Sequence, residues 1–144
     1  MIVHAGLVAR RLGGSWRGVL IEGASGAGKS DLALRALDQG FRLVADDRVL
    51  LWVAEGRLFG RAPGPLHGLL EVRGLDVVTQ TALPLCEVAL VVSPGAPERL
   101  PDPARVERLG LWLPALTLAY REASAPAKLG RALAALYLAN QKRM

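Results

Sequence analysis

The stretch from Gly18 to Gln39, GVLIEGASGAGKSDLALRALDQ, decides the fold. It begins with a short apolar run, Gly18–Glu22, that is typical of a buried strand. The next eight residues, Gly23–Ser30, fit the pattern G-x-x-x-x-G-K-[ST]. A helix is predicted over Ser30–Gln39, because its apolar residues recur on one face and Gly40 follows it. A strand, a glycine-rich loop and a helix in this order predict an α/β fold built around a phosphate-binding loop.

The glycine-rich loop has the composition of a site for the phosphates of ATP. Glycines let the backbone curl so that successive N–H groups point at phosphate oxygens, and the helix N-terminus adds partial positive charge. We expect Lys29 to reach the β and γ phosphates and the Ser30 hydroxyl to bind Mg²⁺. An ordinary turn with a surface lysine is the alternative, but the strand before and the helix after the loop disfavour it. The predicted nucleotide-binding residues are Gly23, Ala24, Ser25, Gly26, Ala27, Gly28, Lys29 and Ser30.

Two adjacent carboxylates, Asp46 and Asp47, follow a second apolar run, Phe41–Ala45. A strand that follows the loop helix can return beside the strand that precedes the loop, as in a βαβ unit. Both carboxylates would then lie at the loop's end of the sheet. Such pairs are often solvated turns or helix caps. Their place beside the loop favours chemistry instead: one carboxylate would help to hold Mg²⁺ and the other would accept a proton from an attacking hydroxyl.

A third acidic position lies in a predicted strand, Leu69–Val78. Glu71 and Arg73 are two residues apart and would therefore face the same side of that strand. One interpretation is a surface ion pair worth at most about 1 kcal/mol. The other is a second carboxylate for Mg²⁺ with an arginine that neutralises the phosphoryl group during transfer.

The rest of the sequence predicts a mostly β, twisted sheet with a flanking helix and a C-terminal helix, in one domain spanning residues 1–144. The apolar stripe of the last helix indicates core packing, with docking on another subunit as the alternative. The further predicted elements are a strand at Met1–Ala9, a hairpin of Val49–Ala54 and Arg57–Arg61, a strand at Glu87–Val92, a proline-rich loop at Ser93–Pro103 and a helix from Pro126 onward.

Composition excludes several classes of protein. With 51% hydrophobic and 22% charged residues, the chain is neither disordered nor membrane-spanning, since no apolar run approaches about 20 residues. Its one cysteine, Cys86, excludes an internal disulfide, and the N-terminus does not resemble a secretory signal. The net charge of +5 is not clustered, which argues against a nucleic-acid partner. We therefore expect a cytoplasmic protein.

Four motifs together resemble the catalytic domain of HPr kinase/phosphorylase, a bacterial serine kinase that acts on the HPr phosphocarrier of the phosphotransferase system. In the family's order they are His4-Ala5-Gly6, GASGAGKS at Gly23–Ser30, LVADD at Leu43–Asp47 and LLEVRGL at Leu69–Leu75. The resemblance is continuous from about residue 2 to residue 78. It implies a nucleotide core similar to that of phosphoenolpyruvate carboxykinase, an HPr-type protein as partner and an assembly of several copies.

The resemblance also implies roles for single residues. Asp46 would be the base that deprotonates the target serine, assisted by His4, and the acid in the reverse phosphorolysis. Arg73 would lie in the family's signature strand near the reacting group. The Mg²⁺ ligands would be Ser30, Asp47 and Glu71.

This sequence departs from the family in three places. It begins almost at the catalytic core, like short family members without the N-terminal domain, and Asp76 replaces the usual glycine of the signature. The C-terminal part, including Ser93–Pro103, does not preserve the family segment that contacts the partner and neighbouring subunits. Two alternatives therefore stay open: a small-molecule kinase with Ser93–Pro103 as its lid, and a non-catalytic regulator that senses a nucleotide.

Overall fold

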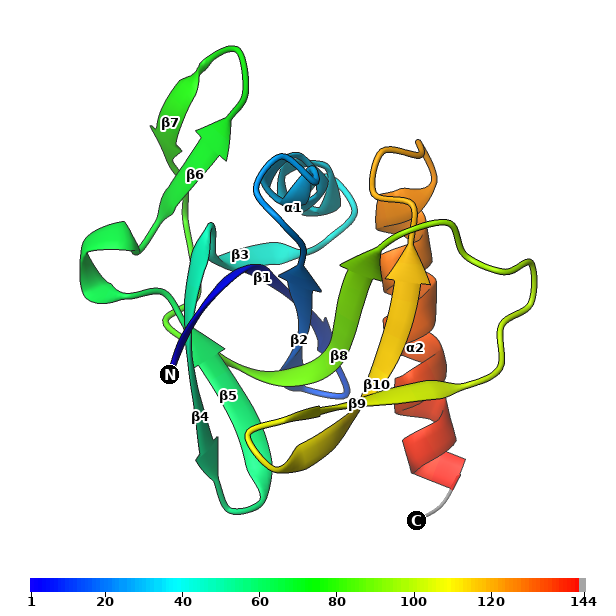
Figure 1. The fold of residues 1–144 in the computed structure, drawn as a ribbon. Helices are drawn as coiled ribbons and strands as arrows, with labels where there is room; N and C mark the ends of the chain where they lie inside the picture. The colour runs from blue at the N-terminus through cyan, green and yellow to red at the C-terminus, as the bar shows by residue number, and fades with distance from the viewer. Residues whose placement is uncertain (143–144) are drawn as a thin grey trace.

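Strands make up most of the fold (Figure 1). The computed structural model describes residues 1–142. In chain order, its elements are β1 (Ile2–Leu12), β2 (Ser15–Glu22), α1 (Lys29–Leu37), β3 (Arg42–Ala45), β4 (Arg48–Ala54), β5 (Arg57–Arg61), a 3-10 helix (Gly64–Leu66), β6 (Leu69–Val72), β7 (Asp76–Thr79), β8 (Cys86–Pro94), β9 (Ala104–Arg108), β10 (Leu111–Leu118) and α2 (Ala125–Lys142).

Five of these strands close into a barrel. β2, β1, β4, β5 and β8 are hydrogen-bonded in that order, and β8 also pairs with β2 in parallel. β10 extends the sheet beyond β8, and β9 forms its edge. β3 pairs with β1, while β6 and β7 form a separate hairpin that projects from the body of the molecule (Figure 1). The strand that leads into the glycine-rich loop, β2, thus has a hydrogen-bonded neighbour on each side.

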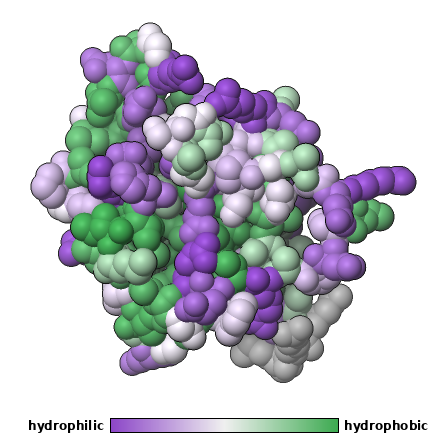
Figure 2. Space-filling model, viewed as in Figure 1, coloured by the Kyte–Doolittle hydropathy of each residue, from purple (hydrophilic) through white to green (hydrophobic). Residues whose placement is uncertain are grey.

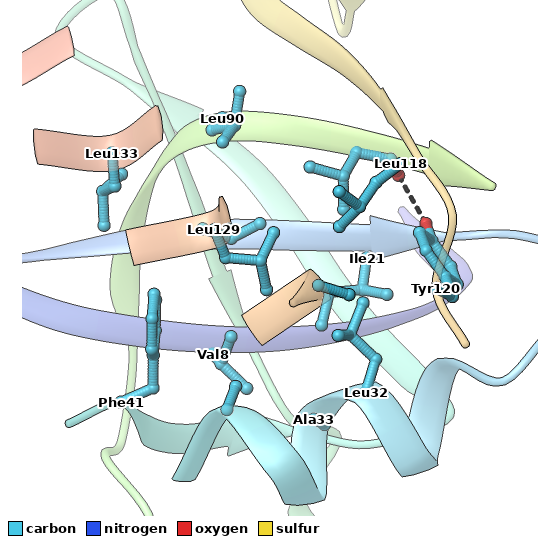
Figure 3. Close-up of a cluster of buried hydrophobic side chains, with 14 of the residues drawn as sticks. Val8, Ile21, Leu32, Ala33, Phe41, Leu90, Leu118, Tyr120, Leu129 and Leu133 are labelled. Atoms are coloured by element: carbon cyan, nitrogen blue, oxygen red, sulfur yellow. Dashed lines mark hydrogen bonds between the residues drawn. The ribbon is translucent and has the colours of Figure 1, made fainter. Parts of the chain in front are cut away.

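Strand alternation builds two apolar cores. In β1, Leu7 points into the barrel whereas Val8 points toward the helices, and both are fully buried. Figure 3 shows the second core, in which Leu32 of α1 and Leu129 of α2 meet the outer face of the sheet. The stripe predicted for the C-terminal helix is confirmed as core packing, since Leu129 and Leu133 are both buried.

One glycine is required by the close approach of two barrel strands. A Cβ placed on Gly18 of β2 would lie 2.6 Å from the sulfur of Cys86 on β8. A side chain at this position would force the two strands apart. The short apolar run that begins at Gly18 therefore contributes to closing the barrel as well as to its core.

The structure confirms the loop followed by a helix and the hairpin of β4 and β5, but it corrects two predictions. β3 does not pair with β2; it pairs antiparallel with β1, because the β1–β2 hairpin and β8 occupy both sides of β2. The predicted strand Leu69–Val78 is two strands, β6 and β7. A turn at residues 73–75 separates them, with Gly74 at a φ of 84° and the Leu75 N–H bonded to the Val72 carbonyl.

Two strands were not anticipated. The predicted loop Ser93–Pro103 gives its first two residues to β8, and β9 and β10 follow it. β9 escapes a hydrophobicity pattern because it is a largely exposed edge strand of sequence ARVER. β10 contains Pro114 opposite Arg105 of β9.

The surface is mixed in character. Figure 2 shows hydrophobic residues over the lower left of the molecule and on the projecting hairpin, with polar residues between them. On the hairpin, the exposed apolar side chains are Leu75 and Val77. No helix within the described residues is long and apolar enough to cross a membrane.

Candidate functional site

The glycine-rich loop is shaped for an anion. Gly26 and Gly28 have φ angles of 85° and 100°, which favour glycine and let the backbone turn tightly into α1. Gly28 precedes the helix and provides no side-chain cap. The N–H groups in the first turn of α1 have no acceptors within the helix, and their partial positive charge favours an anion at this end.

Lys29 is folded back over the same loop. Its ammonium donates hydrogen bonds to the carbonyls of Gly23 and Ala24, at 2.6 and 3.1 Å. The residue is 9% exposed, which is unusual for a lysine and keeps its charge close to the backbone of the loop. A positive charge and a helix N-terminus are therefore concentrated in a few residues.

Asp46 joins three separate parts of the chain. One carboxylate oxygen, Oδ1, accepts a hydrogen bond from the Ser30 hydroxyl at 2.7 Å, and Oδ2 accepts one from the Glu71 N–H at 3.0 Å. The residue is 6% exposed. β2 and β3 are both antiparallel to β1, so they run in the same direction and end at the same edge of the sheet. The predicted position of Asp46 beside the loop is thus confirmed, although the predicted strand pairing was wrong.

Asp47 has a different environment from its neighbour. Its φ of 67° is rare for a residue with a side chain, and the Arg48 N–H closes a γ-turn around it by bonding to the Asp46 carbonyl at 2.7 Å. The Ala5 N–H holds the Asp47 carbonyl at 3.2 Å. The Asp47 side chain is 62% exposed, and its nearest cationic partner is Arg48 at 3.8 Å. The strained turn buries one carboxylate and presents the other to solvent.

A cavity of about 260 Å³ opens between the loop and the β6–β7 hairpin. It brings together most of the residues predicted to form the site. Its lining consists of Ser25, Gly26, Gly28, Lys29, Ser30, Asp31, Asp47, Glu71, Arg73 and Arg121.

Arg73 reaches this cavity from the turn between β6 and β7, and not from a strand face shared with Glu71 as predicted. His4 does not line the cavity. It is exposed on β1, opposite Arg48 of β4, one residue before the amide that holds the Asp47 backbone. The structure therefore places the backbone of His4 near the turn of Asp47 and leaves its side chain outside the cavity lining.

Sequence reasoning missed Arg121. It lies between β10 and α2, far along the chain from the motifs, yet its guanidinium donates a hydrogen bond to the Gly26 carbonyl of the loop. Arg121 lies three residues after the end of β10, a strand that is only partly buried and was not anticipated. The position of a charged residue after a buried strand, which identified Asp46, therefore gave no signal for Arg121.

The residues around the cavity fit a magnesium–nucleotide complex better than an isolated cation. No group of three or more His, Cys, Asp or Glu side chains within residues 1–142 is placed to hold a metal ion. Mg²⁺ in nucleotide sites is usually bound by one or two carboxylates together with phosphates and water. The hydroxyl of Ser30 and the carboxylates of Asp47 and Glu71 are oxygen donors on the same cavity, as such a site needs.

Comparison with known proteins gives the family. A family model described as the HPr serine kinase C-terminal domain matches residues 11–83. The chain belongs to this family. The matched range includes the glycine-rich loop, Asp46 and the β6–β7 hairpin, whereas His4 and Arg121 lie outside it. The HPr serine kinase C-terminal domain family is thus recognised through the part of the chain that forms the centre of the site.

Individual relatives agree with this assignment. The HPr kinase/phosphorylase of Clostridium beijerinckii is 48% identical over 66 residues, which cover 46% of this chain and 22% of that protein. The HPr kinase/phosphorylase of Clostridium tetani matches to the same extent. The match thus spans about a fifth of the length of these curated relatives.

A solved structure extends the similarity of fold to the whole chain. The structure of the Hpr(Ser) kinase/phosphatase from Coxiella burnetii covers 98% of this chain and 99% of its own, with a TM-score of 0.81 and 23% sequence identity. β9, β10 and α2, which lie outside the family match, therefore belong to a fold already seen in a solved structure.

Proposed function

We propose that this protein is an ATP-dependent serine kinase that phosphorylates an HPr-type phosphocarrier protein. The observation that carries the proposal is the position of Asp46, whose carboxylate bonds the hydroxyl of the last loop residue, Ser30, beside an anion-binding loop. The relatives described above, an HPr kinase/phosphorylase and an Hpr(Ser) kinase/phosphatase, support the same reaction class.

The loop would hold the phosphates of ATP and Lys29 would neutralise them, in a core similar to that of phosphoenolpyruvate carboxykinase. Bound Mg²⁺ would offset the charge of the γ phosphate. Ser30, Asp47 and Glu71 are the residues that would hold it. Arg73 would add positive charge from the hairpin side of the cavity.

Asp46 would act as the general base. Its Oδ1 is engaged by the Ser30 hydroxyl in the structure without ligands. Rotation of the Ser30 hydroxyl away from Asp46 would free Oδ1 to accept the proton of the incoming serine. The serine oxygen bonds to the γ phosphorus, the bond from that phosphorus to ADP breaks, and the serine proton moves to Asp46. In phosphorolysis the protonated Asp46 would return a proton to the serine oxygen as inorganic phosphate takes the phosphoryl group.

His4, at the turn of Asp47, would help to set the position of the aspartate pair.

We further propose that residues 1–144 act as one catalytic domain and that several copies assemble. The cavity is bordered by an exposed hairpin with apolar side chains, Leu75 and Val77, which a protein substrate could cover. A small-molecule kinase would need a closed pocket and a lid. The segment proposed as that lid, Ser93–Pro103, contributes no residue to this cavity.

The test is transfer of phosphate from γ-labelled ATP with Mg²⁺ to the purified HPr-like protein of the same host. Acid-stable label on a serine, lost in Asp46→Asn, is the expected result. Release of that label on addition of unlabelled phosphate would support phosphorolysis. Binding of ATP without any transfer would overturn the kinase proposal in favour of a nucleotide-sensing regulator.

A further inference from the structure

Arg121 borders two adjoining hollows at the glycine-rich loop. It lines the cavity that contains Ser30, Asp47 and Glu71, and it also lines an open hollow beside Ala27 and Pro94. Its guanidinium donates to the Gly26 carbonyl, and a Cβ placed on Gly28 would lie 3.6 Å from its Nε atom. An exposed arginine thus lies directly against the most tightly turned part of the loop.

The backbone that carries Arg121 is fixed to the core by the preceding residue. Tyr120 is 3% exposed, and its hydroxyl donates to the Val92 carbonyl at 2.9 Å (Figure 3). The same hydroxyl contacts the carbonyl of Glu22, the residue immediately before the loop. Burial raises the pKa of the Tyr120 hydroxyl, which therefore stays protonated further into the alkaline range than an exposed tyrosine. The end of β10 and the start of the loop are therefore tied together.

A second tie comes from the loop helix. Arg35 of α1 donates to the carbonyls of Tyr120 and Glu122, the residues on either side of Arg121, the latter at 3.0 Å. Asp31 holds the Arg35 side chain at 2.9 Å. The helix that begins at the loop is thus hydrogen-bonded to the backbone on both sides of Arg121. The side chain of Arg121 is left free to reach over the loop.

Charge pairing separates Arg121, and Arg73 across the same cavity, from three other arginines of the described residues. Arg35, Arg48 and Arg108 each have a carboxylate within salt-bridge distance. Within residues 1–142, Arg121 has no such carboxylate, and the acceptor found for it is a neutral carbonyl. A guanidinium has five N–H donors in a planar fork that suits phosphate oxygens. One carbonyl leaves most of these donors available to a ligand.

From this arrangement we propose that Arg121 is a phosphate-binding residue that contacts the terminal phosphoryl group of ATP from the side opposite the β6–β7 hairpin. The inference rests on the proposed function, because it assumes that the loop binds a nucleoside triphosphate. It assigns to the β10–α2 connection a role in holding the group that is transferred. Tyr120 and Arg35 act as positioning residues for it.

The test compares the affinities for ATP and ADP, measured by calorimetry with Mg²⁺, in the wild type and in Arg121→Ala. A charge-assisted contact to the terminal phosphate predicts a loss of about 10- to 100-fold for ATP and of less than about 3-fold for ADP. Arg121→Lys keeps the charge without the fork and should recover part of the loss. Arg131→Ala, an exposed arginine on α2, is the matched control and should bind both nucleotides as the wild type does.

Each other outcome overturns a defined statement. Unchanged ATP affinity in Arg121→Ala would overturn the assignment while leaving the kinase proposal standing. An equal loss for ATP and ADP would also overturn it, because the contact would then lie on an inner phosphate. A wild-type protein that binds neither nucleotide would overturn the proposed function itself. Thermal unfolding of each variant separates loss of fold from loss of binding.

Discussion

The two walls of the cavity are built in different ways. The β10–α2 wall, residues 119–122, is tied to the body of the molecule through the Tyr120 hydroxyl and the Arg35 guanidinium. The β6–β7 wall is a two-stranded hairpin that projects outward, with Leu75 73% exposed at its tip (Figure 1). Two-stranded hairpins have little stability of their own. The rigid wall suits the small ligand, and the projecting wall suits a large substrate that must approach and leave.

Asp46 links the loop helix to the β6–β7 wall through the Ser30 hydroxyl and the Glu71 amide, so changing it should have the largest effect. Asp46→Asn keeps the shape of the side chain but cannot accept a proton from serine, and we expect phosphate transfer to fall by about 10²- to 10⁴-fold. Asp47→Asn, with its exposed side chain, should reduce transfer less at saturating Mg²⁺. Measured initial rates decide between them. A larger loss for Asp47→Asn would reverse the two roles.

The rigid wall can be loosened at Tyr120. Tyr120→Phe removes the hydroxyl that donates to the Val92 carbonyl and contacts that of Glu22, and we expect the free energy of unfolding to fall by about 1–3 kcal/mol. Urea denaturation measures this change. Tyr137→Phe is the matched control. Tyr137 belongs to α2, and its partly exposed ring lies against the guanidinium of Arg17 on β2. Equal losses in both variants would remove the distinction between the walls.

Changes at the hairpin tip should leave stability nearly unaltered. Leu75→Ser and Val77→Ser lie on exposed positions, and we expect the free energy of unfolding to change by less than about 0.5 kcal/mol. The KM for the protein substrate should rise by up to about 10-fold while the ATP affinity stays the same. Steady-state kinetics with each substrate varied in turn separates these effects. A shift in ATP affinity alone would mean that the hairpin belongs to the nucleotide site.

The barrel beneath both walls offers a test that is confined to alkaline pH. Burial raises the pKa of the Cys86 thiol from its usual value near 9.0 to about 12. The folded state therefore keeps the thiol protonated where the unfolded state loses the proton. This contribution to stability is complete below pH 9 and is lost as the pH rises toward 12. Cys86→Ala should flatten the decline in unfolding free energy over this range, and an unchanged slope would contradict it.

Local sequence was sufficient for the centre of the site. The loop and its helix depend on spacing within one stretch, and Asp46 follows directly from its place after an apolar strand. Arg121 could not be found in this way, because its position depends on the pairing of β10 with β8 and of β8 with β2, across about a hundred residues of chain. The side of the site that carries the motif is formed by residues close together in the sequence, whereas the side that carries Arg121 is formed by residues far apart in it.

The two corrected predictions have different causes, one local and one non-local. The run Leu69–Val78 is apolar enough for one strand, but Gly74 allows a left-handed turn that the hydrophobic pattern does not register. The position of β3 was misplaced because β1 comes earlier in the chain and takes the place beside β2. Which strands become neighbours is decided by the whole sheet, and a single β-α-β stretch does not contain that information.

The hydrogen bond from the Glu71 amide to Asp46 ties the alignment of the proposed base to the hairpin that would receive the protein substrate. A hairpin bent away from the body of the molecule would take this amide with it and leave Oδ2 of Asp46 without its donor. Docking of the protein substrate on the hairpin and proton abstraction by Asp46 would then be coupled. An enzyme built in this way would be protected against wasting ATP on water while its protein substrate is absent.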